Sequence, residues 1–126
     1  FSERAAGRII EEWKGGNLRK VPKVLPGWRS DDLDTLVEHS PLRTDLEALR
    51  ATMTQDVGIV KSDSRLERAE RRLDHIEKEV TRAWKRCKPT QDLVELRNLV
   101  MVSKMVVSAS KNRRKNVGLH YNLDLS

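Results

Sequence analysis

The chain has 126 residues, of which 37% are hydrophobic, 35% are charged and only 4% are aromatic. A chain of this length can bury one core, but the shortage of aromatic residues argues against a small β-sandwich or barrel. We therefore expect an all-α fold. The 25 basic residues exceed the 19 acidic ones, which leaves nucleic acid or an acidic partner open. The longest apolar run, 99–102, has four residues, so we expect no membrane helix.

The sequence lacks the common motifs of catalysis and metal binding. It has no glycine-rich phosphate loop, no HExxH, no GxSxG and no EF-hand loop, so we predict no catalytic, cofactor-binding or metal-binding residue. Cys87 is the single cysteine and cannot form an internal disulfide, which favours the reducing cytoplasm. The chain starts at Phe1 without an initiator methionine or a signal-peptide pattern, and we interpret it as a fragment.

Residues 1–14 predict a short helix, because apolar residues recur at positions 5/6, 9/10 and 13 with the helical period. A Gly-Gly pair then ends the pattern. Residues 15–39 carry prolines and glycines between isolated apolar residues, which predicts an irregular connector.

A second helix is expected over residues 40–57. Ser40 can cap it, and Pro41 suits the first turn because its missing amide would have no partner there. One apolar stripe follows the helical period: Leu42, Leu46, Leu49, Met53 and Val57. We expect Gly58 to end this helix in the left-handed conformation.

The clearest periodicity predicts a helix over residues 66–87. Its apolar positions alternate at steps of three and four: Leu66, Ala69, Leu73, Ile76, Val80, Ala83 and Cys87. This seam fits either an intramolecular core or a coiled-coil dimer, and we favour the core because neighbouring helices offer it partners. The opposite face is charged and is expected to face water, Arg68 and Arg72 included.

A fourth helix is expected after the Lys88-Pro89 break, with Thr90 as its cap and Gly118 as the left-handed residue that closes it. Five basic residues and no acidic one lie between positions 104 and 115. We favour a solvated helix end there over a nucleic-acid site, because stacking aromatic residues are scarce. Residues 40–126 should therefore form an antiparallel three-helix bundle with an extended tail.

Three stretches go beyond helical composition: DVGIVK at 56–61 followed by LERA at 66–69, then ELRNL at 95–99, then GLHYNLD at 118–124. In this order and at these separations they resemble the C-terminal helical domain of the L-aspartate oxidase family, within the succinate dehydrogenase and fumarate reductase flavoprotein superfamily. The resemblance covers residues 41–124. Residues 1–14 also look like the end of a helix that belongs to the family's flavin-binding domain.

The resemblance implies a longer parent enzyme that uses FAD to oxidise L-aspartate to iminoaspartate, the first step of de novo NAD biosynthesis, in the cytoplasm. The family's catalytic residues and dinucleotide fingerprint belong to segments upstream of Phe1. This chain would then be inactive alone, bind no cofactor itself, and pack against the upstream flavin-binding domain. The alternatives are a succinate dehydrogenase or fumarate reductase parent, or a free-standing basic helical adaptor that binds nucleic acid or protein.

Six residues of these stretches are candidates for structural or domain-contact roles: Gly58, Arg97, Asn98, Gly118, His120 and Asp124. For His120 and Asp124 we weigh a polar latch to the missing domain against a local cap. The side chains of Arg97 and Asn98 are expected either to satisfy loop carbonyls near Gly58 or to reach the other domain.

Overall fold

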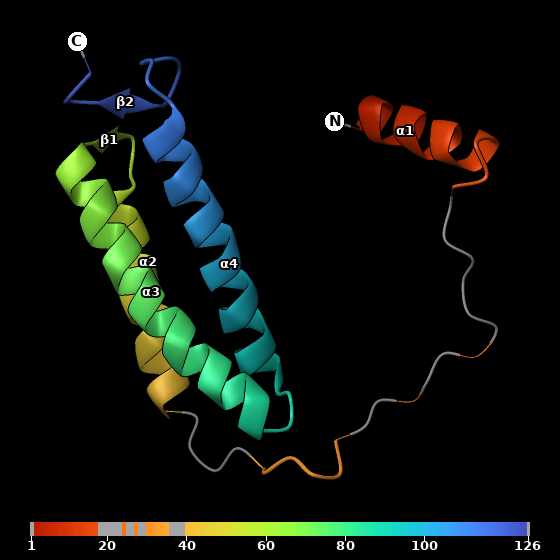
Figure 1. Cartoon of the computed structure of the whole chain (residues 1–126). Helices are drawn as coiled ribbons and strands as arrows, with labels where there is room; N and C mark the ends of the chain where they lie inside the picture. Colours follow the sequence, from red (N-terminus) through yellow and green to blue (C-terminus); the bar gives the residue numbers. More distant parts are fainter. Residues whose placement is uncertain (1, 18–23, 25–26, 28–29, 36–39, 126) are drawn as a thin grey trace.

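A computed structural model describes residues 2–17, 24, 27, 30–35 and 40–125. Three long helices, α2 (Ser40–Asp56), α3 (Asp63–Arg86) and α4 (Gln91–Asn112), run alternately up and down along one another (Figure 1). The expected all-α, antiparallel three-helix bundle is confirmed. Each helix carries an apolar stripe on its inner face, and the three stripes meet in one core.

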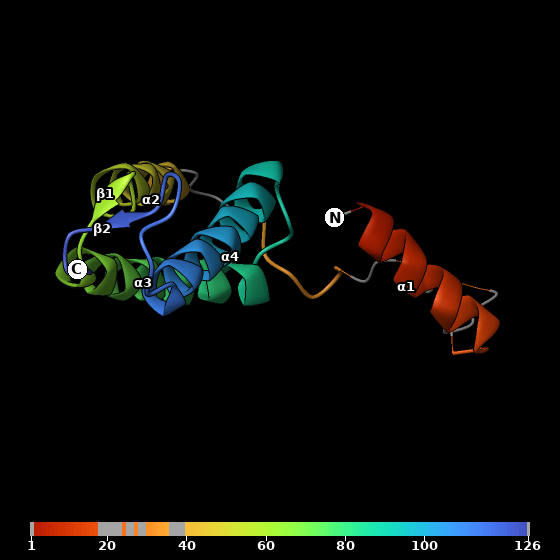
Figure 2. The ribbon, with the colours of Figure 1, turned by 90° about the horizontal axis from the view of Figure 1, so that it is seen from above.

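The seam of α3 is the centre of this core. Five of its seven predicted apolar positions are buried, whereas Ala83 and Cys87, at its C-terminal end, are only partly buried. Helices α2 and α4 pack on α3 from two sides (Figure 2). Because the seam is filled within the chain, the coiled-coil alternative is wrong. The buried apolar residues are Leu42 and Leu49 of α2, Leu66, Ala69, Leu73, Ile76 and Val80 of α3, and Leu93, Leu96, Val100 and Val107 of α4.

Side-chain caps set the starts of α3 and α4. Thr90 is the N-cap of α4, as expected, and its hydroxyl accepts from the amide of Leu93 at 3.3 Å. Ser62 caps α3 in the same way, so this helix starts three residues before its first predicted seam position. Ser40 lies within α2 rather than at its cap, and the cap position, residue 39, lies outside the described residues.

Two predictions about glycines need correction. Gly58 follows α2 but is not left-handed; a side chain there would instead meet the carbonyl oxygen of Thr54 at 2.9 Å. Gly118 is left-handed, with φ of 62°, but α4 ends at Asn112. Gly118 therefore does not close the helix. It lies in a later turn, in which the backbones of Val117 and His120 hydrogen-bond to each other.

A short parallel pair of strands, which the sequence does not predict, joins the tail to the bundle. Strand β1 (Val60–Lys61) lies between α2 and α3, and β2 (Tyr121–Asn122) lies in the tail. The amide of Leu123 donates to the carbonyl of Lys61 at 2.9 Å. Strands of two residues are too short to show the alternation that marks a strand in a sequence. The pairing attaches the tail to the bundle, so the tail is not merely extended.

Helix α1 (Ser2–Lys14) lies apart from the bundle in both views (Figures 1 and 2). Its apolar residues are exposed, Trp13 by 72%. Part of the connector contacts the bundle at the turn between α3 and α4, where Asp34 donates to the carbonyl of Arg86 and accepts from the amide of Lys88. No described helix is long and apolar enough to span a membrane.

Replacing Gly118 with valine is expected to cost about 1–2 kcal/mol of folding free energy, because a β-branched residue is strained at positive φ. Nothing lies within 4 Å of a Cβ built at this position, so the cost comes from the backbone alone. Gly118→Asn is the matched control, since asparagine tolerates this conformation. Equal melting temperatures for the wild type and both variants would contradict this explanation.

Candidate functional site

A buried carboxylate joins α2 to α3. The Asp56 side chain is fully buried, and Arg68 of α3 binds it with both Nε, at 3.0 Å from Oδ2, and Nη2. The guanidinium of Arg72 lies 3.5 Å from the same carboxylate. The hydrogen bond from Arg68 holds the pKa of Asp56 below its usual range. The expectation that both arginines simply face water is therefore wrong.

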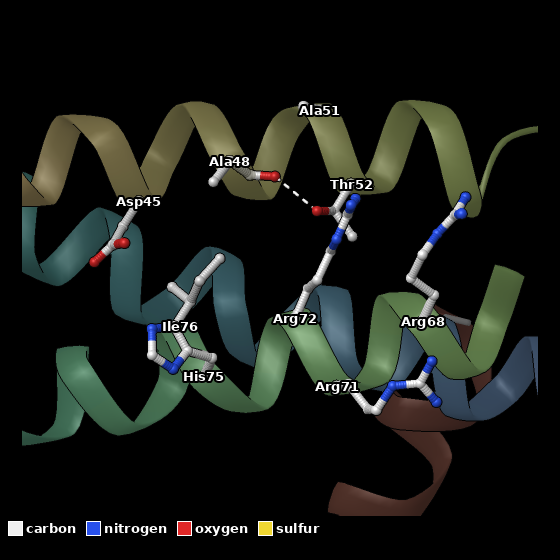
Figure 3. Close-up of a pocket in the computed structure, with 9 residues that line it drawn as sticks. All are labelled: Asp45, Ala48, Ala51, Thr52, Arg68, Arg71, Arg72, His75 and Ile76. Carbon is white, nitrogen blue, oxygen red and sulfur yellow. Dashed lines mark hydrogen bonds between the residues drawn. The ribbon is translucent and has the colours of Figure 1, made fainter.

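The same arginines border a groove of about 570 Å³ between α2 and α3 (Figure 3). Arg68 and Arg72 extend toward α2, whereas Arg71 is directed away from it. Because Asp56 holds two of these three cations, the groove is a structural seam between two helices. The 56–61 and 66–69 stretches contain Asp56 and Arg68, but their spacing does not reveal that the two side chains meet.

Arg97 and Asn98 lie far from Gly58. The guanidinium of Arg97 stacks 4.5 Å from the ring centroid of Trp84, near the C-terminal end of α3. Gly58 lies beside the other end of that 24-residue helix, roughly 30 Å away at 1.5 Å per residue. Of the two alternatives for these side chains, the one that has them satisfy carbonyls near Gly58 is therefore wrong. Asn98 is exposed.

The tail is held by a network around Asn122, which is 1% exposed. Its amide nitrogen donates to the Asp63 carboxylate at 2.7 Å, and its amide oxygen accepts from the backbone of Asp124. Arg114 also binds Asp63, and the hydrogen bond from Asn122 is the main cause that lowers the pKa of Asp63. Asn116 holds the backbone of Asn122 from the other side.

Asp124 faces the bundle. Its carboxylate accepts from the backbone amide of Asp63, the first residue of α3, at 2.6 Å. This is a capping contact, because the first amides of a helix have no partner within it. For Asp124 this contact favours the local cap over the latch toward another domain.

His120 differs from Asp124. Its ring nitrogen Nε2 is inaccessible to solvent and has no hydrogen-bond partner among the described residues. The ring lines an open cavity of about 580 Å³ at the end of α4, together with Lys61 of β1. Lys61 is 5% exposed, and burial lowers the pKa of its ammonium group. Lys61 cannot be singled out from the sequence, because a lysine gives no sign of its burial.

The basic stretch at 104–115 is largely committed to ion pairs within the bundle. Lys104 binds Asp74 and Glu77 of α3, and Lys111 binds Glu70 at 2.6 Å. Arg114 pairs with Asp63, as described above. These ion pairs join α4 and the residues after it to α3. They neutralise much of the positive charge that a nucleic-acid-binding surface would need. The expected solvated helix end therefore needs correction, because Lys104 and Lys111 are held in ion pairs with α3.

The outer face of α4 carries a stripe of exposed apolar side chains, here called the α4 face. Met105 is 60% exposed and Val102 is 55% exposed. Monomeric proteins rarely leave such continuous stripes in water. The α4 face consists of Leu99, Met101, Val102, Met105 and Val106.

No group of three or more potential metal ligands exists among the described residues.

Comparison with protein families places the bundle in a defined class. Residues 46–126 match the model of the fumarate reductase flavoprotein C-terminal domain. The match covers well over half of the chain and includes the tail network. This chain belongs to the family of flavoprotein C-terminal domains defined by that model.

The similar curated proteins narrow the class. The chain is 32% identical to an L-aspartate oxidase of Pseudomonas aeruginosa over 98% of its own length and 22% of that protein. It is 36% identical to the Acinetobacter baylyi L-aspartate oxidase over 79% of this chain and 18% of that protein. It is also 36% identical to the Yersinia pestis L-aspartate oxidase, over 83% of this chain and 20% of that protein. The chain thus spans about a fifth of these relatives.

Proposed function

We propose that this chain is the C-terminal helical domain of an FAD-dependent L-aspartate oxidase, and that it docks on the flavin-binding domain through the α4 face. The parent enzyme would remove two electrons and two protons from L-aspartate to give iminoaspartate, with FAD as the first acceptor. The observation that carries the docking is the exposure of Val102, Met105 and their neighbours. The relatives have about five times the length of this chain, which leaves ample polypeptide to cover that face.

The described residues do not fit a flavin. A dinucleotide site needs a strand, a glycine-rich turn and a helix whose N-terminus meets the pyrophosphate. The described strands have two residues each, and a serine hydroxyl and an aspartate carboxylate already occupy the N-terminus of α3. FAD therefore belongs to the upstream domain in this proposal, and the chain alone is inactive.

The division of the chain follows the same proposal. Residues 1–14 would be the end of a helix of the flavin-binding domain, because the apolar side of α1 is exposed at Ile9, Ile10 and Trp13. Residues 15–39 would be the connector, and 40–126 the bundle. Asn98, which borders the α4 face beside Leu99, would contact the flavin-binding domain. The compartment would be the cytoplasm, where the free thiol of Cys87 stays reduced.

The identity is tested on the natural protein, recovered from its source cells with an antibody to this chain. We expect a polypeptide several times larger, with a flavin absorption spectrum and turnover of L-aspartate. A flavoprotein that oxidises succinate instead would favour the succinate dehydrogenase alternative. A colourless protein of the size of this chain that binds single-stranded RNA, with affinity falling steeply as salt rises, would favour the adaptor.

The docking surface is tested with Val102→Asp/Val106→Asp. Both side chains are exposed here, so the melting temperature of this chain should change by no more than about 2 °C. In the parent enzyme the buried charges should weaken docking, and flavin retention and activity should fall at least about tenfold. Thr44→Asp/Thr81→Asp, at exposed positions of α2 and α3, is the control. Equal activity of the two double variants would exclude the α4 face as the docking surface.

A further inference from the structure

The cavity beside the tail is lined by two polar side chains whose hydrogen-bonding capacity is not filled, a histidine with an unpartnered ring nitrogen and a lysine with a single acceptor. It is lined by Lys61, Arg113 and His120, and its apolar wall includes Val57, Val106 and Leu119. Buried polar groups in folded proteins are nearly always hydrogen-bonded, so each exception needs an explanation. His120 Nε2 is such an exception among the described residues, and the buried ammonium of Lys61, which has no anionic partner there, lines the same cavity.

Lys61 is held in place by its backbone. Its carbonyl accepts from Leu123, and the β1–β2 pairing aligns it with Asn122. The buried ammonium has three donors but makes one hydrogen bond, to the carbonyl of Ile59 at 3.2 Å. No carboxylate among the described residues lies within ion-pair distance of it. A buried cation without an anion is costly, so an anionic acceptor would relieve a real penalty.

His120 is the second group. The turn at Gly118 and the Val117–His120 backbone bonds hold the residue at the start of β2. The ring lines the same cavity as the ammonium, and in its Nε2-protonated form it carries a donor that has no acceptor among the described residues. Arg113, exposed at the C-cap of α4, adds positive charge. Two donors and a nearby guanidinium suit a carboxylate, which accepts through two oxygens.

The location indicates where that carboxylate comes from. Val106 belongs both to the cavity wall and to the α4 face, so the cavity is continuous with the proposed docking surface. We infer that the cavity receives the carboxylate of an aspartate or glutamate side chain of the flavin-binding domain, which accepts hydrogen bonds from Lys61 Nζ and His120 Nε2. This inference rests on the proposed function. In this inference His120 makes the polar contact with the flavin-binding domain, whereas Asp124 caps α3 within the bundle.

The first test compares the same substitution in two contexts. In this chain Lys61→Met removes a buried cation without an anionic partner, so the melting temperature should stay equal or rise. In the parent enzyme it should leave the docked carboxylate unpaired and speed flavin release at least about fivefold. His120→Ala should behave in the same direction. Lys78→Met, at an exposed position of α3, is the control and should change neither quantity.

Three results would overturn the inference. An equal loss of stability in this chain and in the parent on Lys61→Met would make Lys61 a structural residue only. A parent with unchanged flavin release in Lys61→Met, but loss of flavin in Val102→Asp/Val106→Asp, would keep the docking surface and remove the carboxylate contact. Unchanged flavin release in both variants would remove the docking surface as well.

The second test does not depend on a parent enzyme. Acetate is the probe, and the ring signals of His120, assigned by their loss in His120→Gln, are followed by proton NMR in this chain. Acetate should shift these signals more than chloride at equal ionic strength, and the shift should disappear in Lys61→Met. Equal shifts with acetate and chloride would overturn the carboxylate site. If acetate shifts the His120 signals but Lys61→Met leaves flavin release from the parent unchanged, the cavity is a site for free anions. That result would overturn the proposed contact with a carboxylate side chain of the flavin-binding domain.

Discussion

Replacing Asp56 with alanine is expected to lower the free energy of unfolding by about 1.5–3 kcal/mol, the range for a lost hydrogen bond to charged groups. The carboxylate is fully buried and joins α2 to α3 through Arg68 and Arg72. Both arginine side chains are about half exposed, at 49% and 51%. They regain water when the carboxylate is gone, which keeps the loss below that of a fully buried pair.

Urea unfolding of this chain at neutral pH, followed by helical circular dichroism, measures the effect. Asp45→Ala is the matched control, because Asp45 lies on the same helix and lines the same groove. Burial raises the pKa of Asp45, so removal of its charge should cost less than about 0.5 kcal/mol. Equal losses in the two variants would show that Asp56 has no special structural role.

The pH dependence of the same pair has a definite sign. The pKa of Asp56 is lower in the folded chain, mainly through the hydrogen bond from Arg68. A lowered pKa adds stability that is fully present above the ordinary carboxyl pKa of about 4 and disappears as the pH falls through the folded value. The stability difference between the wild type and Asp56→Ala should therefore shrink below about pH 4. A difference that stays constant to pH 2 would contradict the ion pair.

Leu73→Ala is expected to cost about 3 kcal/mol, within the range for a large-to-small substitution in a rigid core. Leu73 is fully buried near the middle of the α3 seam, where α2 and α4 pack on both sides. Neither helix can move inward without disturbing its other contacts, so a cavity remains. The change in urea midpoint at constant slope gives the value.

The control for Leu73 is a leucine of the α4 face. Leu99 is 38% exposed in this chain, and Leu99→Ala should cost less than about 1 kcal/mol because little area leaves the core. In the parent enzyme the same change should weaken docking and raise flavin loss. A cost in this chain as large as that of Leu73→Ala would place Leu99 in the core and argue against the α4 face.

Much of the fold follows from local patterns. The α3 seam predicts its buried positions because each of those side chains returns to one face every three or four residues. Thr90 predicts the start of α4 because a cap depends only on the amides that follow it. The boundaries near Gly58 and Gly118 were less predictable, since a glycine permits several conformations and the surrounding chain selects one.

The candidate site was less predictable than the helices. Asp124 and His120 are four residues apart in one motif, yet one caps α3 and the other lines a cavity. Lys61 gave no signal, because burial of a lysine depends on what packs over it. The charged face of α3 also predicts the wrong surroundings for Arg68 and Arg72. Both reach the Asp56 carboxylate of α2, which the helical period of α3 alone cannot place nearby.

The sequence by itself determined the all-α class, the three stripes that meet in the core, the cap at Thr90 and the family to which the chain belongs. Only the tertiary structure decided the Asp56–Arg68 pair, the β1–β2 contact, the cap from Asp124 and the cavity at Lys61 and His120. The physical reason is separation along the chain. Helical periodicity and caps act within about four residues, whereas Asp63 and Asp124 are 61 residues apart and meet only because three helices pack antiparallel.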